Sequence, residues 1–223
     1  MAREKTIGKA LNSILFVSVV SFVGTVPVPA ESHKPRLSSV IADMDTVRTH
    51  HLSDGTVLKQ VQSWRFIRDA HGRTRIEQDD RVFINDPVLK RIFVLVPAAR
   101  TAYKAASDPS AHSGIPAPQP GNESEMRLKA ELGQRTIEGI TVRGKEWVKT
   151  IPANSRLGND RPIEQTFTVW YSEQLALAIR TTVHSPLFGV LETSFRNIQT
   201  GVEIDSSLFD VPADYKLVDR LTP

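Results

Sequence analysis

Two carboxylates that are two residues apart, Asp43 and Asp45, are the first side chains whose spacing could support chemistry. In a strand, residues i and i+2 point to the same face, so these carboxylates would lie side by side. Such a pair can bind a cation or share one proton. The commoner outcome is a solvated sheet face with no bound ion. A helical stripe also fits this segment and would separate the carboxylates; it consists of Leu37, Val40, Ile41, Met44 and Val47.

Four arginines surround a predicted turn at Gly72. Guanidinium groups bind phosphates and carboxylates through paired hydrogen bonds, so this cluster could recognise an anion. Acidic residues nearby, Glu77, Asp79 and Asp80, offer the alternative of cross-strand ion pairs on a wet sheet face. The candidate anion-binding residues are Arg65, Arg68, Arg73 and Arg75.

No sequence motif indicates catalysis or a bound cofactor. Adjacent histidines, His50 and His51, would point to opposite faces of a strand and would not share a metal ion. The chain has no cysteine, which excludes disulfides, thiolate zinc sites and a cysteine nucleophile. We therefore expect no metal and no cofactor, and a hydrolase would need a site that converges only in the folded chain.

Residues 1–30 have the composition of an export signal. A basic start precedes an apolar run, and Val28-Pro29-Ala30 resembles a signal-peptidase site. The run falls short of the roughly 20 apolar residues that span a bilayer, and an uncleaved anchor is the alternative. We expect a protein exported to the periplasm or secreted, and the absence of cysteine excludes a lipoprotein.

The net charge of the chain gives no argument for binding nucleic acid. Its formal value is +3, and removal of residues 1–30 lowers it to +1, because the segment contains three basic residues and one acidic residue. Nucleic-acid binding needs a clustered basic face. We therefore expect no nucleic-acid partner.

The remainder of the chain, residues 31–223, is predicted to form a single β-rich domain. Stretches rich in β-branched and aromatic residues alternate with turn signals such as Asp54-Gly55 and Asp86-Pro87, which indicates an antiparallel meander. A proline-rich loop is expected at about residues 106–125, and one helical turn at Asp205 to Phe209. The predicted strands are 40–51, 57–68, 73–78, 82–85, 91–96, 101–104, 145–151, 163–171, 175–184 and 188–198.

Several predicted strands have apolar side chains on both faces, as Phe167 and Trp170 show in one strand. Both faces of such a strand need cover, which is either protein or a hydrophobic ligand. The candidate ligand-lining residues are Trp147, Phe167, Trp170, Phe188 and Phe195.

Short motifs along the chain resemble a family of uncharacterised secreted bacterial proteins. They include Asn85-Asp86-Pro87, Ile151-Pro152-Ala153, Arg161-Pro162-Ile163, Trp170-Tyr171-Ser172 and Val211-Pro212-Ala213-Asp214-Tyr215. More distantly, the succession of strands and the ending at Phe209 to Pro212 are similar to the periplasmic lipoprotein-carrier superfamily (LolA, LolB and RseB-like proteins). That resemblance implies a mainly β fold, a curved antiparallel sheet or incomplete barrel, with short helical segments over its concave side. It also implies a concave apolar surface that holds acyl chains.

Three functions follow as hypotheses. The first is a non-enzymatic extracytoplasmic module that binds a lipid, a lipoprotein acyl chain or another amphipathic ligand on the concave face. The second is an envelope domain for protein interaction or sensing. The third, which has the least support in the sequence, is a hydrolase.

Overall fold

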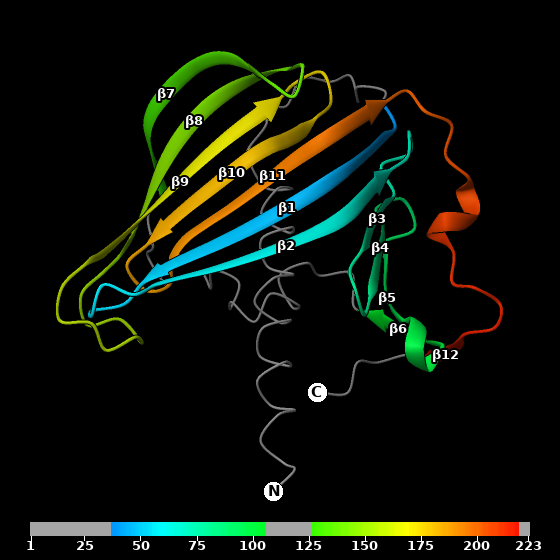
Figure 1. The fold of residues 1–223 in the computed structure, drawn as a ribbon, viewed down its shortest axis with the longest axis horizontal. Coiled ribbons are helices and arrows are strands. Elements are labelled where there is room, and N and C mark those ends of the chain that lie inside the picture. The colour runs from blue at the N-terminus through cyan, green and yellow to red at the C-terminus, as the bar shows by residue number, and fades with distance from the viewer. Residues whose placement is uncertain (1–36, 106–125, 219–223) are drawn as a thin grey trace, which may run out of the picture. The chain divides into compact units, whose positions relative to one another are not determined.

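The computed structural model describes residues 37–105 and 126–218, and these residues belong to one compact unit. They form a single sheet of twelve strands (Figure 1). The spatial order is β12-β6-β5-β4-β3-β2-β1-β11-β10-β9-β8-β7, so β12 and β7 are the two ends of an open sheet. The predicted export signal and the proline-rich loop lie outside the described residues.

Two antiparallel meanders make up the sheet, as the sequence predicts. The Asp54-Gly55 turn joins β1 to β2, and Gly55 has the positive φ that this turn requires. The first meander is β1 (Val40–His51), β2 (Val57–Arg68), β3 (Thr74–Glu77), β4 (Val82–Asp86), β5 (Arg91–Val96) and β6 (Thr101–Ala105). The second is β7 (Met126–Ile137), β8 (Ile140–Ile151), β9 (Ile163–Ser172), β10 (Leu177–Ser185) and β11 (Gly189–Thr200).

Pairing of β1 with β11 joins the two meanders along almost their whole length. The strands come very close at one end, because a Cβ added to Gly189 would lie 2.2 Å from the carbonyl oxygen of Thr49. Only glycine fits there, and its φ of +82° is also in the region that favours glycine. This contact fixes the register in which the N-terminal and C-terminal halves meet.

The structure resolves the ambiguity at residues 37–47 in favour of a strand, because β1 occupies this segment. It also extends the sequence prediction in two places. β7 and the first half of β8 were not predicted, since glycines interrupt the apolar pattern of both segments. Short β12 (Lys216–Val218) pairs with β6 in parallel, so the sheet is mixed and not purely antiparallel. The predicted helical turn is a 3₁₀ helix, η3 (Ser206–Phe209), with Asp205 as its N-cap.

The register of the strands assigns side chains to two faces. We call one the Met44 face; it contains Ala42, Met44 and Thr46 of β1 with their partners Trp64 and Phe66 of β2 and Leu191, Thr193 and Phe195 of β11. We call the other the Asp45 face; it contains Asp43 and Asp45 of β1 with Ser63 and Arg65 of β2 and Ser194 and Arg196 of β11.

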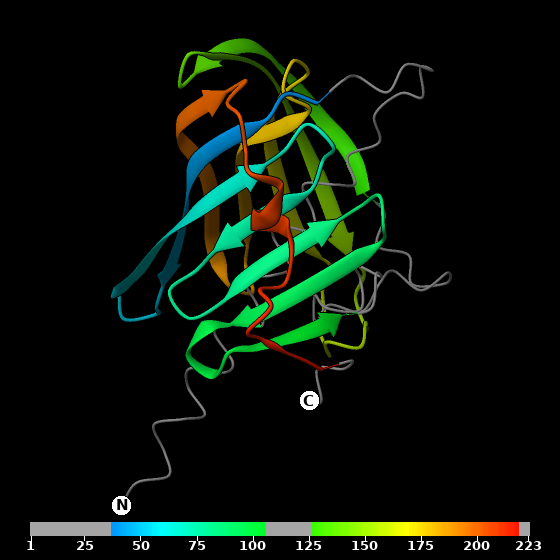
Figure 2. The same ribbon diagram turned by 90° about the vertical axis from the view of Figure 1, so that its right-hand side faces the viewer.

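The Asp45 face of β2 to β6 is covered by the segment that follows β11. A buried cluster forms there from Ile67, Val82, Ile84, Phe93, Leu95, Ala102 and Phe209, and Ile204, Leu208, Val211 and Tyr215 pack against it. Figure 2 shows this segment, in orange to red, in front of β3 to β6, while the rest of the sheet curves away behind them. The sheet therefore curves toward its Met44 face.

Arg68 shows how far the sheet curves. It is the last residue of β2, yet its guanidinium donates to the carbonyl oxygens of Leu175 (2.5 Å) and Ala176 (3.2 Å), in the turn before β10. Three strand spacings separate β2 from β10, which is about 14 Å on a flat sheet and beyond the reach of one side chain. Arg68 also donates to Ser38 (3.1 Å), so one guanidinium connects three segments of backbone.

We expect Arg68→Ala to lower the free energy of unfolding by about 3 kcal/mol, because it leaves three carbonyls without their charged donor in a buried position. Urea unfolding followed by circular dichroism measures this change. Arg65→Ala is the matched control, since Arg65 lies on the same strand and is exposed, and it should cost under about 0.5 kcal/mol. Equal effects of the two variants would contradict the role of Arg68.

Candidate functional site

The Met44 face carries a continuous apolar surface across β2, β1 and β11. Its large side chains around Met44 are under a tenth exposed, whereas Leu58 near the start of β2 is 49% exposed. The rings of Phe66 and Phe195 meet edge to face over β1 with centroids 5.0 Å apart. The surface continues over the first meander through Ile76 and Val94, which are also buried. Its buried apolar members on the three central strands are Val40, Ala42, Met44, Trp64, Phe66, Leu191 and Phe195, and the charged Arg48 lies on the same face opposite Leu191.

Polar groups within this surface bond to one another. The hydroxyls of Thr46 and Thr193 lie 3.3 Å apart across β1 and β11, and both residues are buried. Further along the same face, the amide of Gln165 donates to the hydroxyl of Ser185 at 2.8 Å. Because these groups satisfy one another, they do not require a polar ligand. This part of the face is therefore mainly apolar in character.

The predicted ligand-lining residues divide between the two faces. Phe195, Phe167 and Trp147 share the Met44 face, because Phe167 pairs with Trp147 and with Val183, which in turn faces Leu191. Trp170 lies on the Asp45 face, and Phe188 lies in the turn between β10 and β11. The role of all five residues in holding a ligand stays a prediction.

Sequence reasoning missed four buried members of this surface, namely Ala42, Met44, Trp64 and Phe66. Alternation of Ala42 and Met44 with Asp43 and Asp45 was the signal that could have indicated the buried face of β1. The competing helical pattern concealed that signal, because Met44 fits both periods.

Asp43 and Asp45 do share one face, as the strand interpretation predicts, but each has its own donors. Asn197 donates to Asp43 at 2.7 Å, while Ser63 donates to Asp45 at 2.6 Å and Arg196 bonds to the other oxygen of Asp45. The hydrogen bond from Arg196 is the main cause that holds the pKa of Asp45 below its ordinary value, and Ser63 adds to it. The pair therefore acts as part of an ion-paired network that ties β1 to β2 and β11.

The four candidate arginines do not converge on one point. Arg68 belongs to the Met44 face, whereas Arg65 and Arg75 lie on the Asp45 face. Arg73 bonds to Asp69 at 2.6 Å and lies 4.6 Å above the ring of Phe209, and Arg75 bonds to Glu77 at 2.7 Å and to the carbonyl of Leu208 at 2.9 Å. Internal partners thus occupy three of the four guanidinium groups, and an anion site at this turn stays a prediction.

The described residues contain no cluster of side chains typical of a metal site. Within residues 37–105 and 126–218, no group of three or more histidine, aspartate or glutamate side chains could hold a metal ion. His50 and His51 point to opposite faces of β1. Three described serines bond to other side chains: Ser63 donates to Asp45, Ser155 donates to Asn159, and Ser185 accepts from Gln165.

No helix in the described part of the chain is long and apolar enough to cross a membrane. Comparison with protein-family models finds no match, and comparison with curated proteins finds none either.

Solved structures of similar fold include three that cover nearly all of the chain. An uncharacterized conserved protein from Thermus thermophilus matches with a TM-score of 0.48 at 10% identity, over 95% of this chain and 99% of its own. A LolA superfamily protein from Nitrosomonas europaea matches with a TM-score of 0.38 at 11% identity, over 89% of this chain and 96% of its own. The Mycobacterium tuberculosis lipoprotein LppX matches with a TM-score of 0.29 at 16% identity, over 88% of this chain and 99% of its own. The superfamily that the sequence resembles is thus represented among these structures, by the Nitrosomonas europaea protein.

We expect Asp45→Asn to destabilise the protein by about 1 kcal/mol at pH 7, because it removes a partly exposed ion pair with Arg196. The pKa of Asp45 is lower in the folded chain than in the unfolded chain, so its contribution is complete above about pH 4 and is lost as the pH falls through the folded value. Urea unfolding from pH 7 to pH 2 should show the two proteins converging in acid. A difference that persists unchanged to pH 2 would contradict this assignment.

Proposed function

We propose that this chain is an exported, non-enzymatic module that binds a lipid or another amphipathic ligand, with an acyl chain lying on the Met44 face. The continuous apolar surface on the side toward which the sheet curves is the observation that supports this function. The polar pairs inside that surface are already hydrogen-bonded, which favours an alkyl chain over a polar ligand.

The segments that pack on the two faces of the sheet favour the Met44 face as the place where the ligand binds. On the Asp45 side, the segment after β11 packs over the apolar cluster of β2 to β6, so that surface is already used. On the Met44 side, the described residues supply strands and turns but no α-helix. A hydrophobic ligand is one way to complete such a surface.

The energetics of an alkyl chain fit a surface of this kind. Each buried methylene contributes about 0.8 kcal/mol, so ten of them contribute about 8 kcal/mol before the cost of immobilising the ligand is subtracted. Affinity would therefore increase with chain length and would depend little on the headgroup.

Two neighbouring residues of β11 test the proposal, because they point to opposite faces. Leu191→Gln places an amide on the Met44 face, and we expect it to weaken binding of a fluorescent C16 fatty acid by about tenfold. Val190→Gln makes the matched change on the Asp45 face and should alter binding less than twofold. Fluorescence titration measures both, and circular dichroism checks that both variants fold. Equal loss in the two variants, or no saturable binding by the parent protein, would contradict the proposal.

A protein partner is the second candidate, and the outer edge of β2 favours it. β3 pairs with β2 only from Arg65 to Arg68, so the long first part of β2 has no strand on its outer side among the described residues. Residues 57–63 are all exposed, and Val57 and Val61 are more than half exposed. An open strand edge with exposed valines is a place where an extended peptide can add as a further strand.

We expect a photo-crosslinking amino acid at Val61 to yield one discrete protein adduct in intact cells. The same amino acid at His71, an exposed residue in the turn after β2, is the control and should yield none. Electrophoresis followed by mass spectrometry identifies the adduct. Identical adduct patterns from the two positions would count against a docking strand at this edge.

A further inference from the structure

The Asp45 face carries a second group of residues, near the end of the sheet formed by β7. Trp170 of β9 pairs with Gly144 of β8, and its ring lies over this glycine. A Cβ at residue 144 would be 2.6 Å to 2.8 Å from three atoms of the ring, so glycine is required for the ring to lie there. The absence of a side chain at residue 144 thus determines where Trp170 lies.

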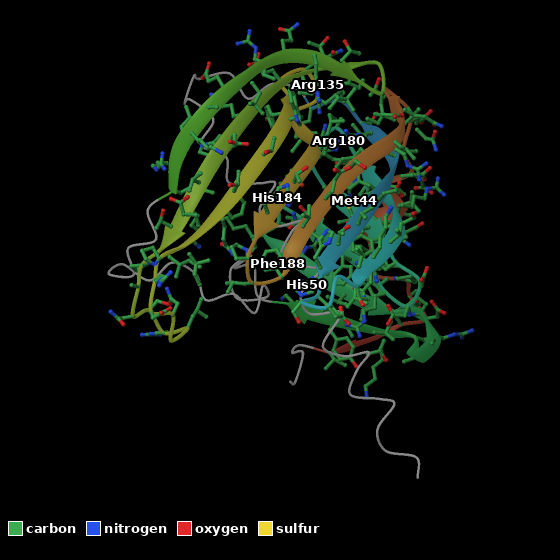
Figure 3. All side chains as sticks on the ribbon, turned by 60° about the vertical axis from the view of Figure 1, so that its left-hand side comes forward. Met44, His50, Arg135, Arg180, His184 and Phe188 are labelled. Atoms are coloured by element: carbon green, nitrogen blue, oxygen red, sulfur yellow. The ribbon has the colours of Figure 1, made fainter. Side chains whose placement is uncertain are left out.

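Arg135 of β7 extends over this ring. Its guanidinium carbon is 3.5 Å from the ring centroid of Trp170, a contact typical of a stacked cation–π pair. The backbone of Gly144, the indole and the guanidinium therefore form three layers. Figure 3 shows Arg135 and Arg180 near each other toward the same end of the sheet.

Arg180 brings a second positive charge into this group. It pairs with Trp170 across β9 and β10, and its Nε atom is buried without a hydrogen-bond partner. A carboxylate oxygen of Glu192 lies 3.9 Å from Nε of Arg180, which is too far for a hydrogen bond. Burial lowers the pKa of Arg135, the charge of Arg180 lowers it further, and Glu192 opposes both.

The charges of this group, which we call the Arg–Trp cluster (Arg135, Trp170, Arg180 and Glu192), do not balance. Two guanidinium groups face one carboxylate, so one positive charge remains, and the Nε–H of Arg180 has no acceptor. An anion with a single charge and two free oxygens would neutralise the cluster and could give one oxygen to each arginine. A phosphodiester has this charge and these oxygens.

We propose that the Arg–Trp cluster binds the phosphodiester of an anionic phospholipid headgroup, so that the protein docks on a membrane through its Asp45 face. Tryptophan and arginine together suit the headgroup region of a bilayer, where aromatic rings and positive charges are both stabilised. This site lies on the opposite face from the proposed acyl surface and is independent of it.

Vesicle co-sedimentation with the full chain tests the proposal. We expect binding to vesicles that contain phosphatidylglycerol and at least tenfold weaker binding to vesicles of phosphatidylcholine, because the ammonium of the latter lies close to the two arginines. Arg135→Gln should reduce binding to phosphatidylglycerol vesicles by about tenfold. Arg143→Gln removes the same charge from an exposed side chain on the other face of β8 and should change binding less than twofold.

Three further outcomes decide the source of the phosphodiester and the position of the site. The change in tryptophan fluorescence on addition of phosphatidylglycerol vesicles should disappear in Trp170→Phe, whose folding is checked by circular dichroism. Saturable binding of soluble glycerophosphoglycerol without binding to vesicles would overturn membrane docking, and so would preferential binding of DNA. Equal loss from Arg135→Gln and Arg143→Gln would show an unspecific effect of charge and would also overturn the proposal.

Discussion

The curvature of the sheet depends on the hydrogen bonds that Arg68 donates. One guanidinium joins the segment before β1, the end of β2 and the turn before β10 through three backbone carbonyls. Burial lowers the pKa of Arg68, and nearby Tyr171 and Asp69 oppose that effect. Arginine remains charged in such a site because its guanidinium keeps its proton far above neutral pH. Carbonyl dipoles compensate the charge here, so the sheet stays curved.

Curvature gives the two faces of the sheet different roles. The Met44 face is drawn inward and holds aromatic and aliphatic side chains, together with the bonded pair of Thr46 and Thr193 and the charged Arg48. The Asp45 face is closed by the segment after β11 over the first meander, and elsewhere it carries ion pairs and the Arg–Trp cluster. The two proposed ligands, an alkyl chain and an anionic membrane surface, would therefore contact opposite faces of one sheet.

The sequence predicted most of the strands because their signals are local. The Asp54-Gly55 turn and the prolines after β4 and β5 mark strand ends within a few residues, and β1, β2 and β5 have the predicted bounds. The glycines of β7 and β8 had the opposite effect and concealed strands. They interrupt the apolar pattern in the sequence, although both strands form with these glycines in place. At Gly144 the reason is Trp170, which lies over it from the neighbouring strand. The site was harder to predict, because the contacts of Arg68, Arg135 and Arg180 join strands that are distant in sequence. Such contacts depend on register and curvature, which alternation within one strand does not reveal.

The methyl group of Met44 offers the most direct test of the Met44 face as a lipid-binding surface. Of the three methionines in the chain, Met44 is 2% exposed on this face, while Met126 is 42% exposed at the beginning of β7. With ¹³C-methyl methionine in the protein and a C16 fatty acid as ligand, nuclear Overhauser contacts can be measured between each methyl group and the acyl methylenes. The proposed function predicts contacts to Met44 that appear in proportion to the bound ligand. If the protein is saturated with the fatty acid and contacts appear at Met126 alone, with none at Met44, the proposed function is contradicted.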